Sequence, residues 1–135
     1  MRNSKKITMN DKFVIDTFAW VEYFLGTKKG EKVKRFIESN NAITPTIVIA
    51  ELSSKYAKES KDFTNKSKFI RFNTKISILN YQIAELAGKI KTEQRKKKET
   101  FGIVDSIIYA TALTLNAKVV TGDPHFKDIK EAIMI

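Results

Sequence analysis

Four carboxylates spread along the chain have the sequence surroundings of a buried acidic site: Asp16, Glu51, Asp105 and Asp123. Each lies within or directly beside an apolar segment, where burial disfavours the charged form of an acid. All four acids would be stabilised by a nearby positive charge, which suggests one shared partner. A divalent cation such as Mg²⁺ or Mn²⁺ fits, because hard cations bind carboxylate oxygens. Such a site can neutralise a phosphate oxygen and lower the pKa of water, and phosphodiester cleavage needs both actions.

Each acid also has a purely structural explanation when it is taken alone. Asp16 lies between a predicted strand and a predicted helix, where Asp often caps the helix, and Asp123 has the same explanation. Asp105 lies near the start of a predicted helix, where a negative charge suits the helix dipole. Glu51 is harder to explain, because it follows an apolar stretch in mid-helix and shares a face with Ile47. The structural explanation of Glu51 is that it lies at the boundary of the core and its side chain reaches water.

The segments that position these acids alternate between strand and helix patterns. Short β-branched or aromatic runs predict strands at residues 13–15, 42–44, 75–79, 118–121 and 132–135. Helical spacing of apolar residues predicts helices at 16–26, 30–38, 45–59, 62–73, 81–97 and 103–115. Thr44 is expected to cap the third helix, with Pro45 in its first turn. Alternating strands and helices predict a parallel sheet with helices on both faces, and its functional crevice lies at the carboxyl ends of the strands.

Length and composition favour one globular domain. The 135 residues are 42% hydrophobic, and no apolar run approaches the length of a membrane span. We expect a polar, Lys-rich tail at residues 1–11, without a signal peptide, and a single domain at residues 12–135, with Met9 as an alternative start. The absence of cysteine excludes disulfides, thiolate metal sites and a Cys nucleophile, and is compatible with a cytoplasmic protein.

The charge balance favours a polyanionic partner. The formal net charge is +10 and the pI about 9.7, which either attracts a polyanion such as nucleic acid or only solubilises the surface. Most of this charge is lysine, which suits phosphate contact but carries no base-reading signature. One basic run, Arg95, Lys96, Lys97 and Lys98, precedes Asp105. It is either a phosphate-contacting edge of the site or a solvated helix end whose cations suit the helix dipole.

The single histidine, His125, follows the last of the four acids. A lone His can act as a general base, but a metal site makes a separate base unnecessary. We therefore expect His125 at the surface or at the edge of the substrate site.

Together these segments resemble the PIN-domain family, especially the short prokaryotic members that include VapC-type toxins. The matching segments are 14–20 (Val-Ile-Asp-Thr-Phe-Ala-Trp), 43–45 and 50–52, 102–112, and 119–126 (Val-Val-Thr-Gly-Asp-Pro-His-Phe). They cover roughly residues 13 to 127 in the expected order.

The resemblance implies a three-layer α/β/α sandwich with a mainly parallel sheet. It also implies a Mg²⁺- or Mn²⁺-dependent endoribonuclease that cleaves RNA with metal-activated water. Its catalytic and metal-binding quartet would be Asp16, Glu51, Asp105 and Asp123, with Thr17 and Thr121 in support. The implied partners are RNA, a second copy of the chain and, for the toxin of a VapBC-type pair, a small antitoxin.

Three alternatives differ in class. A non-catalytic RNA-binding module with this fold would not need four acids that repel the RNA backbone, and the quartet is complete. A PIN ribonuclease of RNA processing, without an antitoxin, would share all the same motifs. A phosphatase on a similar sheet is disfavoured, because the first strand ends in Asp16-Thr17-Phe18, without the second aspartate that haloacid-dehalogenase-like phosphatases use.

Overall fold

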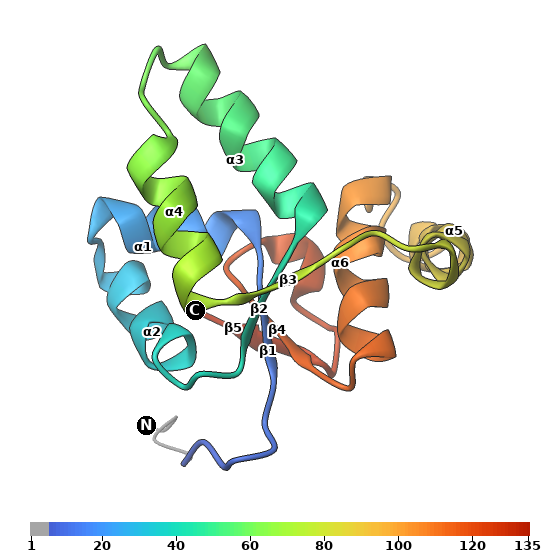
Figure 1. Ribbon diagram of the computed structural model, residues 1–135. Coiled ribbons are helices and arrows are strands. Elements are labelled where there is room, and N and C mark those ends of the chain that lie inside the picture. The colour runs from blue at the N-terminus through green and yellow to red at the C-terminus, as the bar shows by residue number, and fades with distance from the viewer. Residues whose placement is uncertain (1–5) are drawn as a thin grey trace.

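The computed structural model describes residues 6–135 (Figure 1). Its strands are β1 (Phe13–Ile15), β2 (Ala42–Pro45), β3 (Lys75–Ser77), β4 (Lys118–Thr121) and β5 (Ala132–Met134). Its helices are α1 (Thr17–Leu25), α2 (Lys28–Ile37), α3 (Thr46–Lys58), α4 (Thr64–Asn73), α5 (Tyr81–Arg95), α6 (Ile103–Thr114) and a short 3₁₀ turn, η1 (Pro124–Phe126). The strands form one sheet in the order β3-β2-β1-β4-β5, and every neighbouring pair is parallel.

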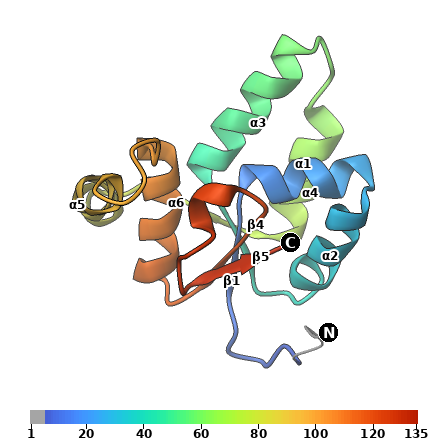
Figure 2. The ribbon, with the colours of Figure 1, turned by 180° about the vertical axis from the view of Figure 1, so that it is seen from behind.

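Helices cover both faces of this sheet. Figures 1 and 2 show α1, α2, α3 and α4 on one side and α5 and α6 on the other. The predicted three-layer α/β/α sandwich is confirmed, with a sheet that is parallel throughout. Because both faces are covered, the central strands are apolar and fully buried, as at Val14, Ile15, Val119 and Val120. No helix within residues 6–135 is long and apolar enough to cross a bilayer.

The strand order places the chain's topological switch point between β1 and β4. From β1 the chain moves outward through β2 to β3, and it later returns to the other side of β1 as β4. Ile15 pairs with Val120, so these two strands end at the same level of the sheet. Asp16, the next residue, donates its backbone N–H to the Val120 carbonyl at 3.3 Å. In parallel sheets a ligand crevice forms outside the carboxyl ends of the strands at this point.

Most predicted element boundaries agree with the structure to within a few residues. Gly26 ends α1 as expected, with a left-handed φ of 69° and its N–H directed to the carbonyls of Glu22 and Tyr23. The predicted helices beginning at residues 30 and 62 begin at Lys28 and Thr64, and the helix predicted to end at 97 ends at Arg95.

The predicted cap of the third helix is wrong. Thr44 lies inside β2, and Pro45 rather than Thr44 takes the cap position of α3, without a side-chain cap. The strand continues through Pro45 because that residue still pairs with Ser77. The Thr44 hydroxyl is buried instead, 2.8 Å from the Thr74 hydroxyl, and it accepts the Trp20 indole N–H at 3.3 Å.

The described part of the predicted N-terminal tail is joined to the domain, and residues 1–5 lie outside the described residues. Ile7 packs against the core, and the Asn41 side chain donates to the Met9 carbonyl at 2.9 Å. The polar segment predicted to begin the chain therefore makes contacts from residue 7 onward.

Candidate active site

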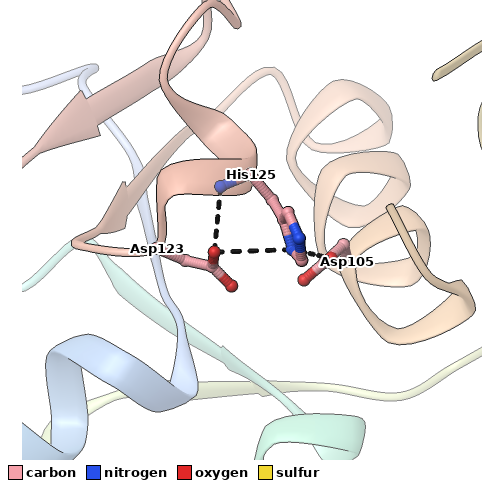
Figure 3. A group of neighbouring side chains, drawn as sticks. All are labelled: Asp105, Asp123 and His125. Atoms are coloured by element: carbon pink, nitrogen blue, oxygen red, sulfur yellow. Dashed lines mark hydrogen bonds and ion pairs between the residues drawn. The ribbon is translucent and has the colours of Figure 1, made fainter. Parts of the chain in front are cut away.

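Three side chains meet beyond the carboxyl end of β4: Asp105, Asp123 and His125. One ligand atom from each lies within 4.8 Å of the other two (Figure 3). Asp105 comes from the first turn of α6, and the other two come from the segment that follows β4. Residues distant in sequence thus meet at the predicted edge of the sheet.

The turn after β4 fixes the positions of Asp123 and His125. The Asp123 N–H donates to the Thr121 hydroxyl at 2.9 Å. Asp123 Oδ1 in turn accepts the His125 N–H at 2.9 Å, which caps η1. This short turn brings the imidazole back over the acids, with Nδ1 2.8 Å from Asp105 Oδ2 and 3.5 Å from Asp123 Oδ1.

His125 Nδ1 is buried and has no aligned hydrogen-bond partner. The 2.8 Å separation from Asp105 Oδ2 is short enough for a hydrogen bond, but hydrogen bonds also require alignment along the N–H direction. The other ring nitrogen, Nε2, is 2.9 Å from the Thr100 hydroxyl. One nitrogen is therefore anchored, while the other faces two carboxylates.

Asp105 lies in the first turn of α6, in surroundings that disfavour its charged form. Its Oδ2 lies 3.4 Å from the Gly102 N–H, so it also serves as the first-turn acid that the structural explanation proposed. Burial and the nearby Asp123 carboxylate raise its pKa, while the Gly102 N–H and His125 oppose that shift.

Asp16 is the most deeply buried of the four acids, with 3% of its surface exposed. It caps α1 by accepting the Ala19 N–H at 2.8 Å, so the structural explanation holds for it too. Its pKa is raised to about 7, mainly by burial and to a smaller extent by the Asp123 and Asp105 carboxylates, while hydrogen bonds from the Thr121 side chain and the Ala19 backbone oppose the shift. Asp16 therefore belongs electrostatically to the same cluster, although it lies outside the tight group of three.

Glu51 makes a contact with Thr17 and lines a groove on α3. Its Oε1 accepts a hydrogen bond from the Thr17 hydroxyl at 2.5 Å, which links it to the residue after Asp16. A groove of about 440 Å³ begins at Ala50 and Glu51 and runs along α3 past Ser54, Lys55 and Lys58. Glu51 is partly buried and lines an open groove, which agrees with the structural explanation of a boundary residue that reaches water.

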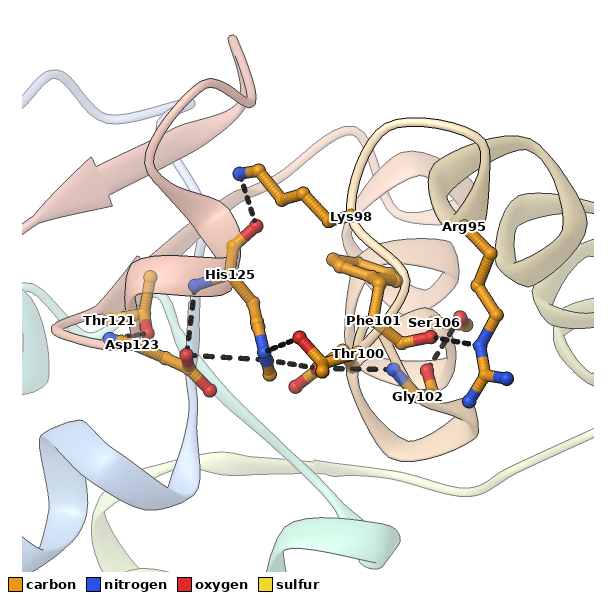
Figure 4. Close-up of polar contacts among 10 residues, drawn as sticks. Arg95, Lys98, Thr100, Phe101, Gly102, Ser106, Thr121, Asp123 and His125 are labelled. Carbon is orange, nitrogen blue, oxygen red and sulfur yellow. Dashed lines mark hydrogen bonds and ion pairs between the residues drawn. The ribbon is translucent and has the colours of Figure 1, made fainter.

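The basic run beside the site makes contacts within the chain (Figure 4). Arg95 Nε donates to the Phe101 carbonyl at 2.9 Å, and Lys98 Nζ donates to the His125 carbonyl at 2.8 Å. Lys96 pairs with Glu93 at 3.1 Å, and Lys97 is exposed. Arg95 and Lys98 thereby hold the loop 96–102 next to His125, a structural role that the sequence did not suggest.

The residues of this cluster fit a divalent cation. Two carboxylates and a buried nitrogen without a partner offer three donor atoms within 4.8 Å of one another. Carboxylates are ligands of both Mg²⁺ and Mn²⁺ in proteins, and imidazole is a ligand of first-row transition ions. A positive charge there would also offset the desolvation and mutual repulsion that raise the pKa values of Asp16 and Asp105.

His125 is the residue of this site that the sequence underrated. It was expected at the surface or the substrate edge, and its side chain is indeed one-third exposed, at 33%. The spacing Asp123-Pro124-His125 held a usable signal, since an Asp-capped turn that starts with Pro returns the second following side chain toward the cap.

Comparisons with known proteins identify the fold. A family model for the PIN domain matches residues 13–132. No curated protein matches the chain.

Among solved structures, a toxin–antitoxin complex from Klebsiella pneumoniae is similar at 17% identity and a TM-score of 0.74, covering 91% of this chain and 97% of the other. VapBC2 from Rickettsia felis, bound to a DNA fragment from its promoter, is similar at 24% identity and a TM-score of 0.70, covering 91% and 96%. DNA-bound VapBC from Salmonella typhimurium is similar at 20% identity and a TM-score of 0.71, covering 93% and 97%.

Proposed function

Because the chain belongs to the PIN-domain family, we propose that it is a Mg²⁺- or Mn²⁺-dependent endoribonuclease, and more narrowly the toxin of a VapBC-type pair. The observation that carries the proposal is the meeting of Asp105, Asp123 and His125, with Asp16 close behind them, at the switch point of the sheet. When bound, the divalent ion supplies charge neutralisation at a phosphate and a lowered pKa for water.

The chain's own residues hold and orient the reactants. Asp105 and Asp123 would hold the ion, and the nearby Asp16 would add negative charge to the site. Thr121 fixes Asp16 and Asp123 together, because its hydroxyl contacts both residues.

Thr17 and Glu51 belong to the rim of the same proposed site. Thr17 holds the Glu51 carboxylate at the mouth of the groove along α3. Both positions adjoin the site without entering its tight group of donor atoms.

RNA is the proposed substrate because the molecule is strongly basic outside an acidic centre. A net charge of +10 draws a polyanion toward the surface, and the acidic cluster then requires a cation before a phosphate can approach. Within the run Arg95, Lys96, Lys97 and Lys98, Lys97 and Lys96 are the exposed cations best placed for phosphate contact, since Arg95 and Lys98 donate to backbone carbonyls.

An antitoxin, a second copy of the chain and a cytoplasmic location complete the proposal. Similar structures are described as toxin–antitoxin complexes, which supports a small antitoxin as partner. The proposal of a homodimer comes from the family resemblance, and a cytoplasmic location is compatible with a chain that has no cysteine.

The test is a cleavage assay on single-stranded RNA with the purified chain. We expect cleavage with Mg²⁺ or Mn²⁺, none after chelation, and none from the Asp16→Asn variant at saturating metal. RNA binding without cleavage under every metal condition would instead support the RNA-binding module. Full cleavage by Asp16→Asn would remove this acid from the mechanism.

A further inference from the structure

His125 combines a buried nitrogen that lacks an aligned hydrogen bond with a position between two carboxylates. Nδ1 lies 2.8 Å from Asp105 Oδ2 and 3.5 Å from Asp123 Oδ1, and it lacks an aligned hydrogen bond. A buried polar atom without a partner is costly, so native structures retain few of them without a reason. We look for the reason that Nδ1 lacks such a partner in the space between the side chains of Asp105, Asp123 and His125.

The imidazole ring is held in place from several directions. Thr100 contacts Nε2 at 2.9 Å, Lys98 binds the His125 carbonyl, and the His125 N–H donates to Asp123. The Phe101 ring packs edge-on against the imidazole, with the ring centroids 6.1 Å apart. Figure 4 shows the His125 backbone held by Lys98 and Asp123 and its ring contacted by Thr100, so the ring is oriented in advance.

The Thr100 contact suits a histidine that binds metal. If the proton is on Nε2, the ring donates it to the Thr100 hydroxyl, and Nδ1 presents its lone pair to the acids. Metal-binding histidines in proteins have this arrangement, in which a second group receives the other ring N–H and fixes the tautomer. A lone pair directed at two carboxylates is unfavourable on its own and becomes favourable with a cation between them.

We propose that His125 Nδ1 is a ligand of the divalent cation held by Asp105 and Asp123, and that it makes the site prefer Mn²⁺ to Mg²⁺. This inference rests on the metal site of the proposed function. Mg²⁺ strongly favours oxygen ligands, whereas a nitrogen donor adds affinity for first-row transition ions along the series that starts at Mn²⁺.

The decisive measurement is the electron spin-echo modulation of Mn²⁺ bound to the whole chain. His125 is the only histidine, so with any affinity tag removed an imidazole ¹⁴N coupling has a single source. We expect this coupling in the unaltered chain, supplied with Mn²⁺ below one equivalent, and its loss in His125→Gln. Its absence from the unaltered chain would overturn the proposal, whatever the variants do, and would leave His125 as a spacer or as a cation paired with the two acids.

Calorimetric titrations with Mn²⁺ and with Mg²⁺ test the preference. Gln reaches toward Thr100 but removes the atom at Nδ1, so His125→Gln should weaken Mn²⁺ binding by roughly 10-fold and Mg²⁺ binding by less than about 3-fold. His125→Asn puts an amide oxygen near the Nδ1 position and should retain Mg²⁺ binding with a lower Mn²⁺ preference. Equal losses for both ions in His125→Gln would overturn the proposal.

Two further variants serve as controls for His125→Gln. Thr100→Val removes the Nε2 partner and should weaken Mn²⁺ binding by a smaller factor, with the ¹⁴N coupling retained. Lys127→Gln changes an exposed residue of the same turn and should alter neither ion.

The RNA assay is read separately from metal binding. Cleavage with Mn²⁺ but without ¹⁴N coupling keeps the proposed function and rejects this inference. A ¹⁴N coupling without cleavage of RNA keeps this inference and rejects the proposed function.

Discussion

The carboxylate of Asp16 stabilises the start of α1, but its negative charge is buried near two other acids. Its carboxylate caps α1 through the Ala19 N–H, which any hydrogen-bond acceptor could do. Its burial beside Asp105 and Asp123 nevertheless raises its pKa to about 7. A neutral residue such as Asn could cap the helix without the cost of a buried charge. The presence of an acid at this position therefore favours a role in binding a cation.

Replacing Asp16 with Asn should stabilise the chain in the absence of metal. The Asn side chain keeps an oxygen for the Ala19 N–H and removes a buried charge. The raised pKa of Asp16 means that its contribution to stability is present below the unfolded pKa of 3.8 and is lost as pH rises toward about 7. Urea unfolding without metal should therefore show Asp16→Asn more stable than the unaltered chain by about 2–4 kcal/mol near pH 7.5 and by much less near pH 4.5.

The control for this variant is Asp128→Asn. Asp128 has a side chain that is 82% exposed, and its loss should leave the unfolding free energy nearly unchanged at both pH values. A stability difference for Asp16→Asn that does not depend on pH would contradict the raised pKa.

A divalent cation should stabilise the unaltered chain more at neutral than at acidic pH. Protons and metal compete for the oxygens of Asp16 and Asp105, whose pKa values are raised in the folded chain without metal. The metal offsets the stability that is lost between the unfolded pKa of 3.8 and neutral pH. Thermal melts with and without Mn²⁺ near pH 5 and pH 7.5 measure this, and a larger shift at acidic pH would argue against a metal site.

The residues of the site were predictable to different degrees. The four acids stand out because each adjoins an apolar segment, and local sequence is enough to see that. His125 and Arg95 do not stand out in the sequence. Their contacts depend on the loop 96–102 and the turn after β4, which meet only in the folded chain. Thr44 was misassigned because its neighbour Pro45 suits both a strand end and a helix start, and pairing with Ser77 decided between them.

At the scale of elements, α1 and α2 meet through a glycine. A Cβ added to Gly30 would overlap the Glu22 carbonyl and approach the Tyr23 Cα at 2.9 Å, both of them backbone atoms. The loop between these helices is short, and α1 must stay in place because its first residues follow directly from Asp16. Close packing of α2 thus supports the helix whose N-terminus carries the site.

Two glycine substitutions should have opposite signs. Gly30→Ala should destabilise the chain by about 1–3 kcal/mol, because the overlapping atoms belong to a helix backbone and cannot rotate away. Gly88→Ala should stabilise it by about 0.5–1 kcal/mol, because Gly88 lies in α5 and an added Cβ meets nothing within 4 Å. Urea unfolding of both variants compares them, and equal effects would mean that α2 shifts freely on α1.

The element order explains why the fold was easier to predict than its contacts. Alternating strand and helix patterns restrict the topologies to a few, because parallel crossovers share one handedness. The sheet order that follows puts β1 beside β4, and so brings Asp16 and Asp123 together across more than a hundred residues. Side-chain contacts such as Thr17 with Glu51 depend on helix orientation, which patterns do not specify.

At the scale of the whole molecule, a strongly basic chain has an acidic site. The chain carries 25 Lys and Arg residues against 15 Asp and Glu, and three of those acids, Asp16, Asp105 and Asp123, lie in or beside the site. A polyanion is therefore attracted from a distance and repelled at the centre until a cation binds there. Metal loading and RNA engagement should be coupled for this reason.

RNA binding should weaken steeply with salt, and the basic run should account for part of the slope. Lys96→Gln with Lys97→Gln removes two exposed cations while leaving Arg95 and Lys98 to hold the loop. If both lysines contact phosphates, the slope of log K against log salt should fall by about 1.4 for single-stranded RNA, measured by fluorescence anisotropy on the Asp16→Asn background.

The matched control for that double variant is Lys32→Gln with Lys34→Gln, which removes the same charge from exposed positions on α2. It should lower affinity slightly through net charge alone and leave the slope nearly unchanged, because long-range attraction does not require particular lysines. Equal slopes for the two double variants would show that Arg95, Lys96, Lys97 and Lys98 form a solvated helix end. The phosphate contacts would then have to be sought along α3, where Lys55 and Lys58 line the groove that begins at Glu51.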